Sequence, residues 1–259
     1  ALKTLFGRLG SGNLDCRQDG AKIGGPRSGY LFNSTIAGID EADALLIIGS
    51  NPRIEAAVMN ARIRRNWLTT GMPIGVVGPT ADLTYDATFL GEDPAVLADL
   101  ASGKHKFAAK LKKAKRPMVI IGMGALARTD GAAVLGHARE IAETYGIVTK
   151  NWNGFNVLHT AASRVAGLDM GFLPEKSGLD INAIYKAAEA GKLDLDVPAL
   201  PLVATALNND NLVSQCKDTR AADITVRHLL HHLCALRGAR AGVIRECARV
   251  GVGTLSSHR

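Results

Sequence analysis

The residues that could do chemistry lie in two short polar stretches of the sequence. The first is NLDCRQDG, a glycine-bounded loop that contains the candidate residues Asn13, Asp15, Cys16 and Arg17. A thiol beside a positive charge is a candidate nucleophile, because the charge stabilises the thiolate. No histidine lies close to this loop in the sequence, since the nearest is His105. The sequence therefore favours a polar loop fixed by its own hydrogen bonds, and it predicts no catalytic residue.

The second stretch, LLIIGSNPR, has the pattern of a phosphate-binding turn. An apolar run of strand length is followed by the candidate residues Gly49, Ser50, Asn51 and Arg53. Asn51 before Pro52 is a typical helix start, and the free N–H groups of a helix start attract anions. A ribose-binding site would normally add an acid after the next strand, where this sequence has Gly78. The stretch could hold a cofactor phosphate, but an ordinary capped turn is favoured.

A third stretch, IIGMGALA, matches the spacing of a dinucleotide-binding fingerprint. Gly122, Gly124 and Ala127 follow an apolar run at the required positions. The fingerprint also needs a helix that begins within the glycines and an acid after the following strand. Here we expect the helix to begin near Asp130 and the next strand to end at residues 149–150. Nicotinamide binding is therefore not favoured.

Cysteine and histidine positions predict no metal site. The four cysteines are far apart and form no CxxC pair: Cys16, Cys216, Cys234 and Cys247. This spacing favours reduced thiols over a disulfide framework and excludes a visible zinc ribbon or cysteine-ligated cluster. His228 and His232 could share one helical face, but no acid or further spaced ligand accompanies them.

The elements that must position these stretches alternate along the chain. Apolar runs predict strands at residues 44–48, 73–77, 118–121 and 147–149. Helical periodicity and capping residues predict helices at residues 52–68, 94–102, 107–114, 131–145 and 181–190, and another that ends near residue 167. Alternation of strands and helices predicts an α/β fold with a doubly wound, mostly parallel sheet.

The helix over residues 52–68 has an apolar pattern that predicts which face packs inward. Its regularly spaced apolar residues are Ile54, Ala57, Val58, Ala61 and Leu68. We expect this set to face the core and the arginines at 62, 64 and 65 to stay largely in water.

Composition divides the chain into three predicted segments. Residues 1–40 are rich in glycine and form a loop-rich entry segment, and residues 41–194 form the α/β domain. Residues 195–259 are rich in arginine and histidine. Two interpretations of this last segment stay open: a basic amphipathic helix with a tail, or the product of a shifted or truncated reading frame.

The distribution of charge argues against a nucleic-acid partner. The net charge is +7, but the last 40 residues hold seven arginines against Asp223 and Glu246. The first 219 residues therefore carry only +2, too little for a typical nucleic-acid-binding body. No apolar run approaches the roughly 18 residues of a membrane span, so we expect none.

Four blocks together resemble one family: GSGNLDCRQDGAKI, YLFNSTIAGIDEADALLIIGSNPRIEAAVMNARIRRNWL, VVGPTADLTYDATFLGEDPAVLADLASGKHKF and ARTDGAAVLGHAREIA. They resemble the C-terminal part of the large iron–sulfur subunit (the 75 kDa class, bacterial or mitochondrial) of respiratory NADH:quinone oxidoreductase, complex I. The resemblance runs from about Ser11 to Asp194. It implies a molybdopterin-oxidoreductase fold of the formate dehydrogenase and DMSO reductase type, incomplete at both ends of this sequence.

The resemblance also carries expectations about cofactors. The family's 2Fe-2S and 4Fe-4S clusters are expected in an N-terminal region that this sequence lacks. Molybdopterin enzymes of this fold bind a guanine dinucleotide at the loop that matches residues 49–51, with an acid after the next strand. They also provide a metal ligand near the stretch that matches residues 15–20. Gly78 replaces the acid and Cys16 is at best adjacent to the ligand position, so a bound molybdopterin is not expected.

Function and partners follow from the resemblance as expectations. We expect a structural domain that supports electron transfer from NADH to quinone without binding the clusters, with both polar stretches as vestigial cofactor positions. The alternative is a molybdopterin-dependent oxidoreductase domain that uses residues 49–53 and the loop 13–19. The implied partners are other hydrophilic-arm subunits, including the NADH- and flavin-binding side. The implied location is peripheral, on the cytoplasmic or matrix face of the inner membrane.

Overall fold

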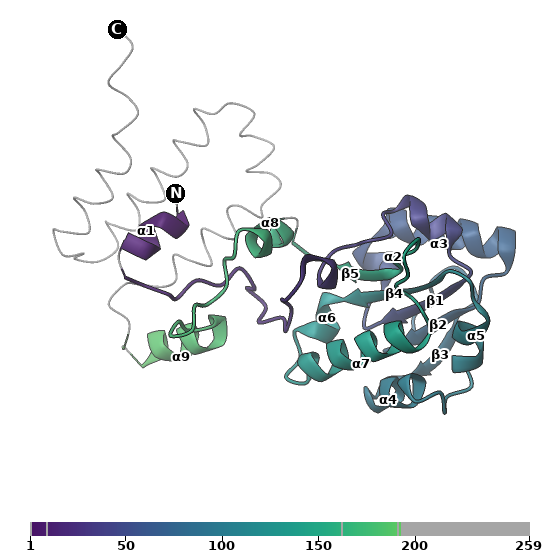
Figure 1. Ribbon diagram of the computed structural model, residues 1–259. Coiled ribbons are helices and arrows are strands. Elements are labelled where there is room, and N and C mark those ends of the chain that lie inside the picture. Colours follow the sequence, from purple (N-terminus) through teal and green to yellow (C-terminus); the bar gives the residue numbers. More distant parts are fainter. Residues whose placement is uncertain (1, 9, 162, 191, 193–259) are drawn as a thin grey trace, which may run out of the picture. The chain divides into compact units, whose positions relative to one another are not determined.

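The computed structural model describes residues 2–8, 10–161, 163–190 and 192 (Figure 1). Two compact units make up the chain. The sheet unit is Asp19–Phe172, and the flanking unit contains the described residues up to Gln18 and from Leu173 onward. Residues 195–259 lie outside the described residues, so both interpretations of that segment and the predicted boundaries at residues 40 and 194 stay predictions.

A five-stranded parallel sheet forms the centre of the sheet unit. Its order is β3-β2-β1-β4-β5, and every pair of neighbours is parallel. The strands are β1 (Ala44–Ile48), β2 (Ile74–Val77), β3 (Thr88–Gly91), β4 (Pro117–Gly122) and β5 (Phe155–Leu158). The chain builds outward from β1 to β3 and then crosses to β4, so the direction of winding reverses between β1 and β4. In open parallel sheets, ligands bind at such a reversal, beyond the carboxyl ends of the strands.

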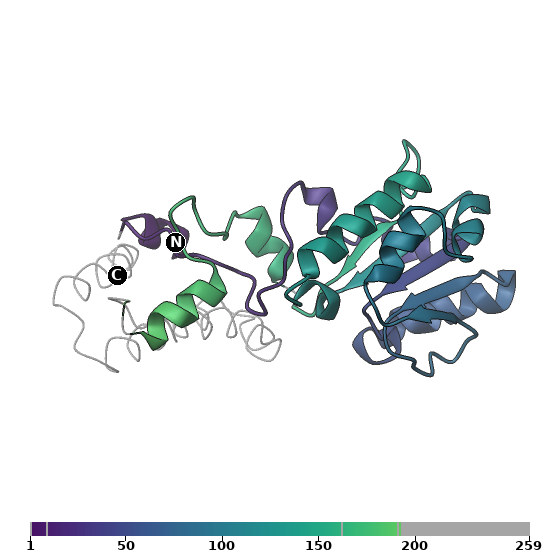
Figure 2. The ribbon, with the colours of Figure 1, turned by 90° about the horizontal axis from the view of Figure 1, so that it is seen from below.

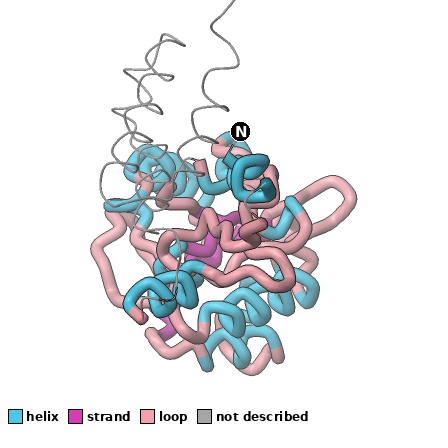
Figure 3. The backbone as a smooth tube through the Cα atoms, turned by 90° about the vertical axis from the view of Figure 1, so that its left-hand side faces the viewer, coloured by secondary structure: helices cyan, strands magenta, loops and turns pink. Residues whose placement is uncertain are grey.

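Helices cover both faces of the sheet, which explains why the central strands are apolar throughout. Figure 2 shows α3 (Ala57–Thr70) on one face, with α4 (Ala95–Ala101), α5 (Ala108–Lys113) and α7 (Gly131–Thr144) on the other. Every residue of β1, β2 and β4 is buried. Ile47 packs with Ile63 of α3 in one buried cluster. The strands lie near the centre of the sheet unit, where Figure 3 draws them in magenta. The predicted α/β class and doubly wound sheet are confirmed.

Three predicted strands are confirmed to within one residue, but the fourth is wrong. Val148 makes only an isolated bridge to Asn153, and the strand that follows β4 in the sheet is β5, which begins later, at Phe155. The edge strand β3 was not predicted from the sequence. Its residues are exposed or half-buried, so it lacks the continuous apolar run of a central strand.

The predicted inward face of the 52–68 helix is wrong. The chain forms two helices there, α2 (Pro52–Glu55) and α3, separated at Ala56 by a non-helical backbone conformation (φ −151°, ψ 62°). Ile54, Val58 and Leu68 are 79%, 81% and 58% exposed. Ala57 and Ala61 are exposed as well. The buried residues of α3 are Met59, Asn60, Ile63 and Asn66.

Two asparagines in the inward face explain this error. The Asn60 side chain donates to the Leu83 carbonyl at 3.0 Å. The Asn66 side chain donates to the carbonyls of Ile39 at 2.7 Å and Ala42 at 2.9 Å. Polar residues can be buried when they satisfy backbone groups in this way. A pattern of apolar residues alone therefore selects the wrong side of the helix.

We expect Asn66→Ala to lower the free energy of unfolding by about 2–3 kcal/mol, because two buried carbonyls lose their donor. Urea unfolding measures this change. Asn151→Ala is the matched control, since Asn151 is exposed in the same unit. We expect that control to stay within about 0.5 kcal/mol of the wild type. Equal effects at the two positions would show that the Asn66 bonds contribute nothing to stability.

Shorter elements complete the described residues. The sheet unit also contains α6 (Met123–Leu126), α8 (Arg164–Asp169) and two 3₁₀ turns at Arg27–Gly29 and Ala37–Glu41. The flanking unit contains α1 (Leu2–Arg8) and α9 (Ile181–Glu189), which confirms the predicted helix near residues 181–190. None of the helices among the described residues has the length and apolar character that a membrane crossing would need.

Candidate functional site

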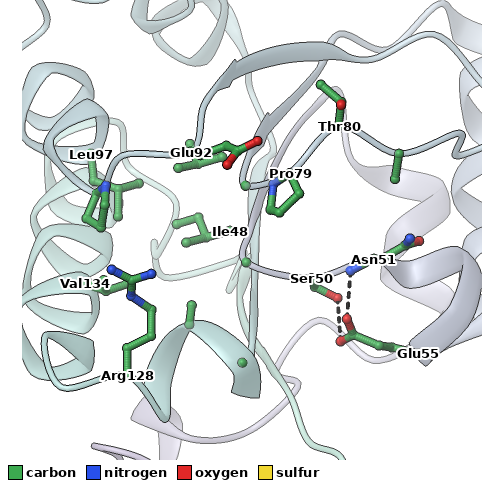
Figure 4. A pocket seen from close by; sticks show the side chains of 17 residues that line it. Ile48, Ser50, Asn51, Glu55, Pro79, Thr80, Glu92, Leu97, Arg128 and Val134 are labelled. Carbon is green, nitrogen blue, oxygen red and sulfur yellow. Dashed lines mark hydrogen bonds between the residues drawn. The ribbon is translucent and has the colours of Figure 1, made fainter.

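A cavity of about 370 Å³ lies where β1, β2 and β4 end (Figure 4). Its walls come from the turns after these three strands, together with Glu92, Pro94 and Leu97, which follow β3, and Val134 of α7. The turn after β1 contributes Gly49, Ser50 and Asn51, and the turn after β2 contributes Gly78 to Thr80. Gly124, Ala125 and Arg128 follow β4. The structure thus brings the second predicted stretch to the edge of the sheet where a ligand would be sought.

The turn after β1 is held by local hydrogen bonds. Gly49 takes a left-handed conformation (φ +57°), and its N–H donates to the Val77 carbonyl at 2.8 Å. The side chain of Asn51 accepts from the Arg53 N–H at 3.2 Å, which confirms Asn51 as the predicted N-cap of α2. The cap directs the backbone from the turn into the helix.

Glu55 binds the groups that a cofactor phosphate would need. Its carboxylate accepts from the Asn51 N–H at 2.8 Å and from the Ser50 hydroxyl at 3.0 Å (Figure 4). The bond to the Asn51 N–H resembles the reciprocal part of a capping box, in which a helix side chain accepts from the N-cap N–H. Glu55 lies four residues after Asn51 in the sequence. That spacing is the local signal that could have identified Glu55 as a residue of this site. An anion at the Asn51 N–H would have to displace a carboxylate already bonded there.

Arg53 also has an internal partner. Its guanidinium donates to both the carboxylate and the backbone carbonyl of Asp82, the carbonyl at 2.9 Å. The Thr84 N–H and Arg53 together hold the pKa of the Asp82 carboxyl below its usual value. Asp82 lies beyond the position where a ribose-binding acid is expected, and that position is occupied by Gly78. The arginine therefore joins two turns of this chain in the structure.

The turns after β1 and β4 approach too closely to leave a gap between them. A Cβ built on Gly49 would lie 2.4 Å from the Ala125 Cβ, and one built on Gly122 would lie 2.4 Å from the Gly49 carbonyl oxygen. The expected helix start near Asp130 is confirmed by α7, whose N-cap is Asp130, but the short helix α6 begins earlier, at Met123, inside the glycine motif. The strand after it ends at Leu158 and is followed by His159, which is not an acid. The turn therefore has the helix start that the dinucleotide-binding fingerprint requires, but it lacks the acid that the fingerprint requires after the following strand.

The candidate residues of the first stretch, Asn13 to Arg17, lie in the flanking unit and are bonded within that unit. The Asp15 carboxylate accepts from the Arg17 guanidinium at 2.8 Å through both Nε and Nη2. This pairing raises the pKa of Arg17. The Asn13 side chain accepts from the Leu179 N–H at 2.9 Å. Cys16 is half-buried, and the neighbouring guanidinium is directed to Asp15. These bonds agree with a polar loop fixed by its own contacts.

In the sheet unit, Asp19 at the end of this stretch joins a polar cluster with Arg164 and His159, two residues that the sequence did not indicate. Arg164 is only 4% exposed and donates to the Asp19 carboxylate at 2.9 Å. His159 contacts the Tyr30 carbonyl through Nε2 at 2.5 Å. Burial lowers the pKa of His159, and the charge of Arg164 lowers it further, against opposing contributions from Tyr30 and Asp19. No group of three or more metal-ligating side chains occurs among residues 2–192 that the structure describes.

The lowered pKa of His159 predicts a pH dependence of folding. The neutral imidazole is favoured in the folded protein, so the unfolded chain binds more protons just below pH 6.5. Stability is therefore fully present above pH 6.5 and decreases as the pH falls from there toward the folded-state pKa. We expect the unfolding free energy to fall between pH 7.5 and pH 5, and to fall less in His159→Gln. An identical pH dependence in the variant would assign the effect to other groups.

Comparisons with known proteins identify the relatives of the chain. The NADH dehydrogenase (ubiquinone) iron-sulfur protein 1, mitochondrial, of Solanum tuberosum is 44% identical over 176 residues, which are 68% of this chain and 24% of the relative. An NADH-quinone oxidoreductase subunit of Rickettsia conorii is 44% identical over 172 residues, 66% of this chain and 26% of the relative. The NADH-ubiquinone oxidoreductase 75 kDa subunit of Reclinomonas americana is 43% identical over 145 residues, 56% of this chain and 21% of the relative.

The chain thus spans about a quarter of the length of the first two of these relatives, 24% and 26%. The resemblance predicted from the sequence is confirmed. A sequence model described as "Molybdopterin oxidoreductase" matches residues 1–193, most of the chain and the whole of the sheet unit. The chain therefore belongs to the molybdopterin oxidoreductase family.

Proposed function

We propose that this chain is a structural part of the large iron–sulfur subunit of an NADH:quinone oxidoreductase. In this role it supports electron transfer from NADH to quinone and binds no redox cofactor itself. The names of its relatives support the assignment to that assembly. The observation that carries the non-catalytic part is the Glu55 carboxylate on the Asn51 N–H and the Ser50 hydroxyl. The candidate residues at both stretches are then vestigial positions of a cofactor site.

The family also suggests a second function, a molybdopterin-dependent oxidoreductase domain. The residues present do not fit that cofactor. A phosphate at the start of α2 would meet the negative charge of Glu55, and like charges at this distance repel. The Ala125 methyl group packs against Gly49 where a side chain of residue 49 would lie, so a ligand could approach this turn only through the cavity, past Glu55. We therefore favour the structural role.

The rest of the proposed arrangement concerns the whole subunit. The 2Fe-2S and 4Fe-4S clusters would lie in the part of the relatives that this chain does not span. The proposed partners are other hydrophilic-arm subunits, including those that bind NADH and flavin. The proposed location is peripheral, on the cytoplasmic or matrix face of the inner membrane.

Elemental analysis of the native assembly tests the proposal. The assembly would be isolated from membranes by its NADH dehydrogenase activity, and molybdenum, tungsten and iron would be counted by mass spectrometry. We expect this chain in the preparation together with iron, and neither heavier metal in proportion to the chain. Stoichiometric molybdenum or tungsten would overturn the structural role. A preparation without this chain would overturn the assignment to the assembly.

Glu55→Gln tests whether the bonded carboxylate has a catalytic or only a structural role. The variant keeps the shape of the side chain and removes its charge. We expect unchanged oxidoreductase activity of the assembly and a loss of about 0.5–1 kcal/mol of stability, as for a weakened helix cap. Glu143→Gln is the control, because Glu143 is exposed on α7. Loss of activity in Glu55→Gln alone would contradict the proposal.

A further inference from the structure

A cluster of lysines surrounds helix α5 of the sheet unit. We define the lysine face by its six members, Lys104, Lys106, Lys110, Lys112, Lys113 and Lys115. All six are exposed, and no aspartate or glutamate occurs between residues 101 and 129. The overall charge conceals this concentration, because the acids of the first 219 residues lie elsewhere along the chain. Protein surfaces usually mix both signs of charge along the chain, so six exposed lysines within residues 104–115 are a local excess of positive charge that can attract an acidic partner.

Core packing fixes the direction of the lysine face. Phe107, Ala108 and Leu111 are buried and form the inner side of the turn and helix. A Cβ built on Gly75 of β2 would lie 2.8 Å from the Phe107 ring, so the ring fills the space that this glycine leaves. Lys106, Lys110 and Lys113 follow at intervals of four and three residues, which place them together on the outer side.

Within the described residues, the lysine ammonium groups have no carboxylate partner at ion-pair distance. Arg116, the next basic residue, is paired with Glu41 and lies 5.9 Å from the centre of the Trp152 ring. The Asp43 carboxylate accepts from the backbone N–H groups of Lys115 and Arg116 at 2.7 and 2.8 Å. Asp43 therefore fixes the turn before β4. The ammonium groups of the lysine face remain available to a charged partner.

Only three of the six lysines lie where their positive charge stabilises helix α5. Lys110, Lys112 and Lys113 lie in the last turn of α5, where positive charge is favourable. Lys104 and Lys106 precede the first turn, where positive charge is unfavourable. Like charges three or four residues apart also destabilise a helix. The local fold therefore gives no reason for the complete face.

We propose that the lysine face binds an acidic segment of another protein subunit, which rests on the proposed function as part of a subunit assembly. The one large apolar side chain of α5, Leu111, is buried, and the exposed Ala109 offers only a methyl group, so the helix lacks the apolar face of an interfacial helix. Phe107 is the one aromatic residue in the segment 104–116 and is 5% exposed, so the face offers no stacking platform for single-stranded nucleic acid. A run of aspartate and glutamate side chains matches the face in charge, and such pairing selects partners and speeds association.

Carbodiimide cross-linking of the native assembly tests the proposal, because the reagent joins an amine directly to a carboxylate in contact with it. We expect peptides that link residues of the lysine face to aspartate or glutamate of a different subunit. Acetylation of amines in the same preparation should be slowed about tenfold at the face relative to the subunit dissociated in high salt, since salt screens such contacts. The exposed residues Lys150, Lys176 and Lys186 should react equally in both states.

Other outcomes would overturn the inference. Equal acetylation of the face in both states, with no cross-link to another subunit, would leave it as a solvated surface. Protection restored only by vesicles that contain anionic phospholipid, or only by duplex DNA, would assign the face to a membrane or a nucleic acid. Absence of the chain from the NADH dehydrogenase assembly would instead refute the proposed function. The two failures are therefore distinct.

A charge-reversal series supplies an independent test in the full subunit. Lys106→Glu, Lys110→Glu and Lys113→Glu together should reduce retention of the subunit in the assembly about tenfold, since like charges would then face the acidic segment. Lys150→Glu, Lys176→Glu and Lys186→Glu change the net charge equally and should leave retention unchanged. The thermal unfolding midpoint of each triple variant distinguishes lost binding from lost folding. Normal retention of the first variant would contradict the proposal.

Discussion

Gly49→Ala is expected to lower the free energy of unfolding by about 3–4 kcal/mol. Two effects combine at this position. Alanine at φ +57° is strained, because its Cβ approaches the following carbonyl oxygen. The added Cβ would also lie 2.4 Å from the Ala125 Cβ and 3.3 Å from the Ala125 backbone, so one turn must move. Urea unfolding of the wild type and the variant measures the sum of both effects.

Gly71 provides a matched control that separates the two effects. It has nearly the same conformation (φ +68°), but nothing lies within 4 Å of a Cβ built there. Gly71→Ala should therefore show the conformational strain alone, about 1 kcal/mol. Ala125→Gly in the Gly49→Ala background should recover the steric part and leave a similar loss of about 1 kcal/mol. Equal losses at Gly49 and Gly71 would show that the two turns separate freely.

Ile63→Ala should cost about 3–4 kcal/mol of stability, whereas Ile54→Ala should change it by less than about 0.5 kcal/mol. Both isoleucines belong to the region predicted as one helix, and the substitution removes the same atoms. Ile63 is 0% exposed and packs in the cluster between α3 and the sheet, so its loss leaves a cavity. Ile54 is 79% exposed and leaves none.

The same pair of variants also tests the periodicity of the sequence. The apolar pattern predicted Ile54 as a core residue, so a large loss at Ile54 and a small one at Ile63 would support that pattern against the structure. Chemical denaturation with both variants in one buffer makes the comparison direct. Equal slopes with denaturant concentration would show that the two variants unfold over the same surface.

Sequence patterns predicted the elements whose signals are local. Strands β1 and β4 are continuous apolar runs because helices cover both faces of the sheet. The start of α2 followed from Asn51 and Pro52, which act within one turn. The resemblance added the family fold, which the alternation of elements alone could give only as a parallel α/β class.

The errors arose where distant residues decide the outcome. The inward face of α3 depends on carbonyls of Ile39, Ala42 and Leu83, which bind its two asparagines from other parts of the chain. The edge strand β3 depends on pairing with β2, because its own residues are only partly buried. Neither the bonds of the two asparagines nor the pairing of β3 with β2 can be predicted from the neighbouring residues in the sequence.

The candidate site was also predicted only in part: the sequence indicated its position but not its internal contacts. The residues after β1 were found because parallel sheets bind ligands where their strands end, and those after β4 because their glycines have the fingerprint spacing. The contacts that Glu55, Asp82 and Ala125 make with these turns were not predicted. A turn that is free to bind a ligand and a turn that is bonded internally have the same local sequence pattern. The clearest sequence signal for occupation was the acid four residues after the N-cap.

The two contacts at the end of β1 have a consequence for descent within the family. If an ancestor held a phosphate there, the Glu55 carboxylate now accepts from the Asn51 N–H and the Ser50 hydroxyl in its place, and Ala125 packs against Gly49. Replacing Glu55 to admit a ligand would remove the bonds that hold the start of α2, so the first step back would lower the stability of the fold. The close-packed turns would meanwhile be retained for the stability that they give the sheet. Loss of a ligand in such a lineage is a one-way change, and the fold outlasts the chemistry for which it was first selected.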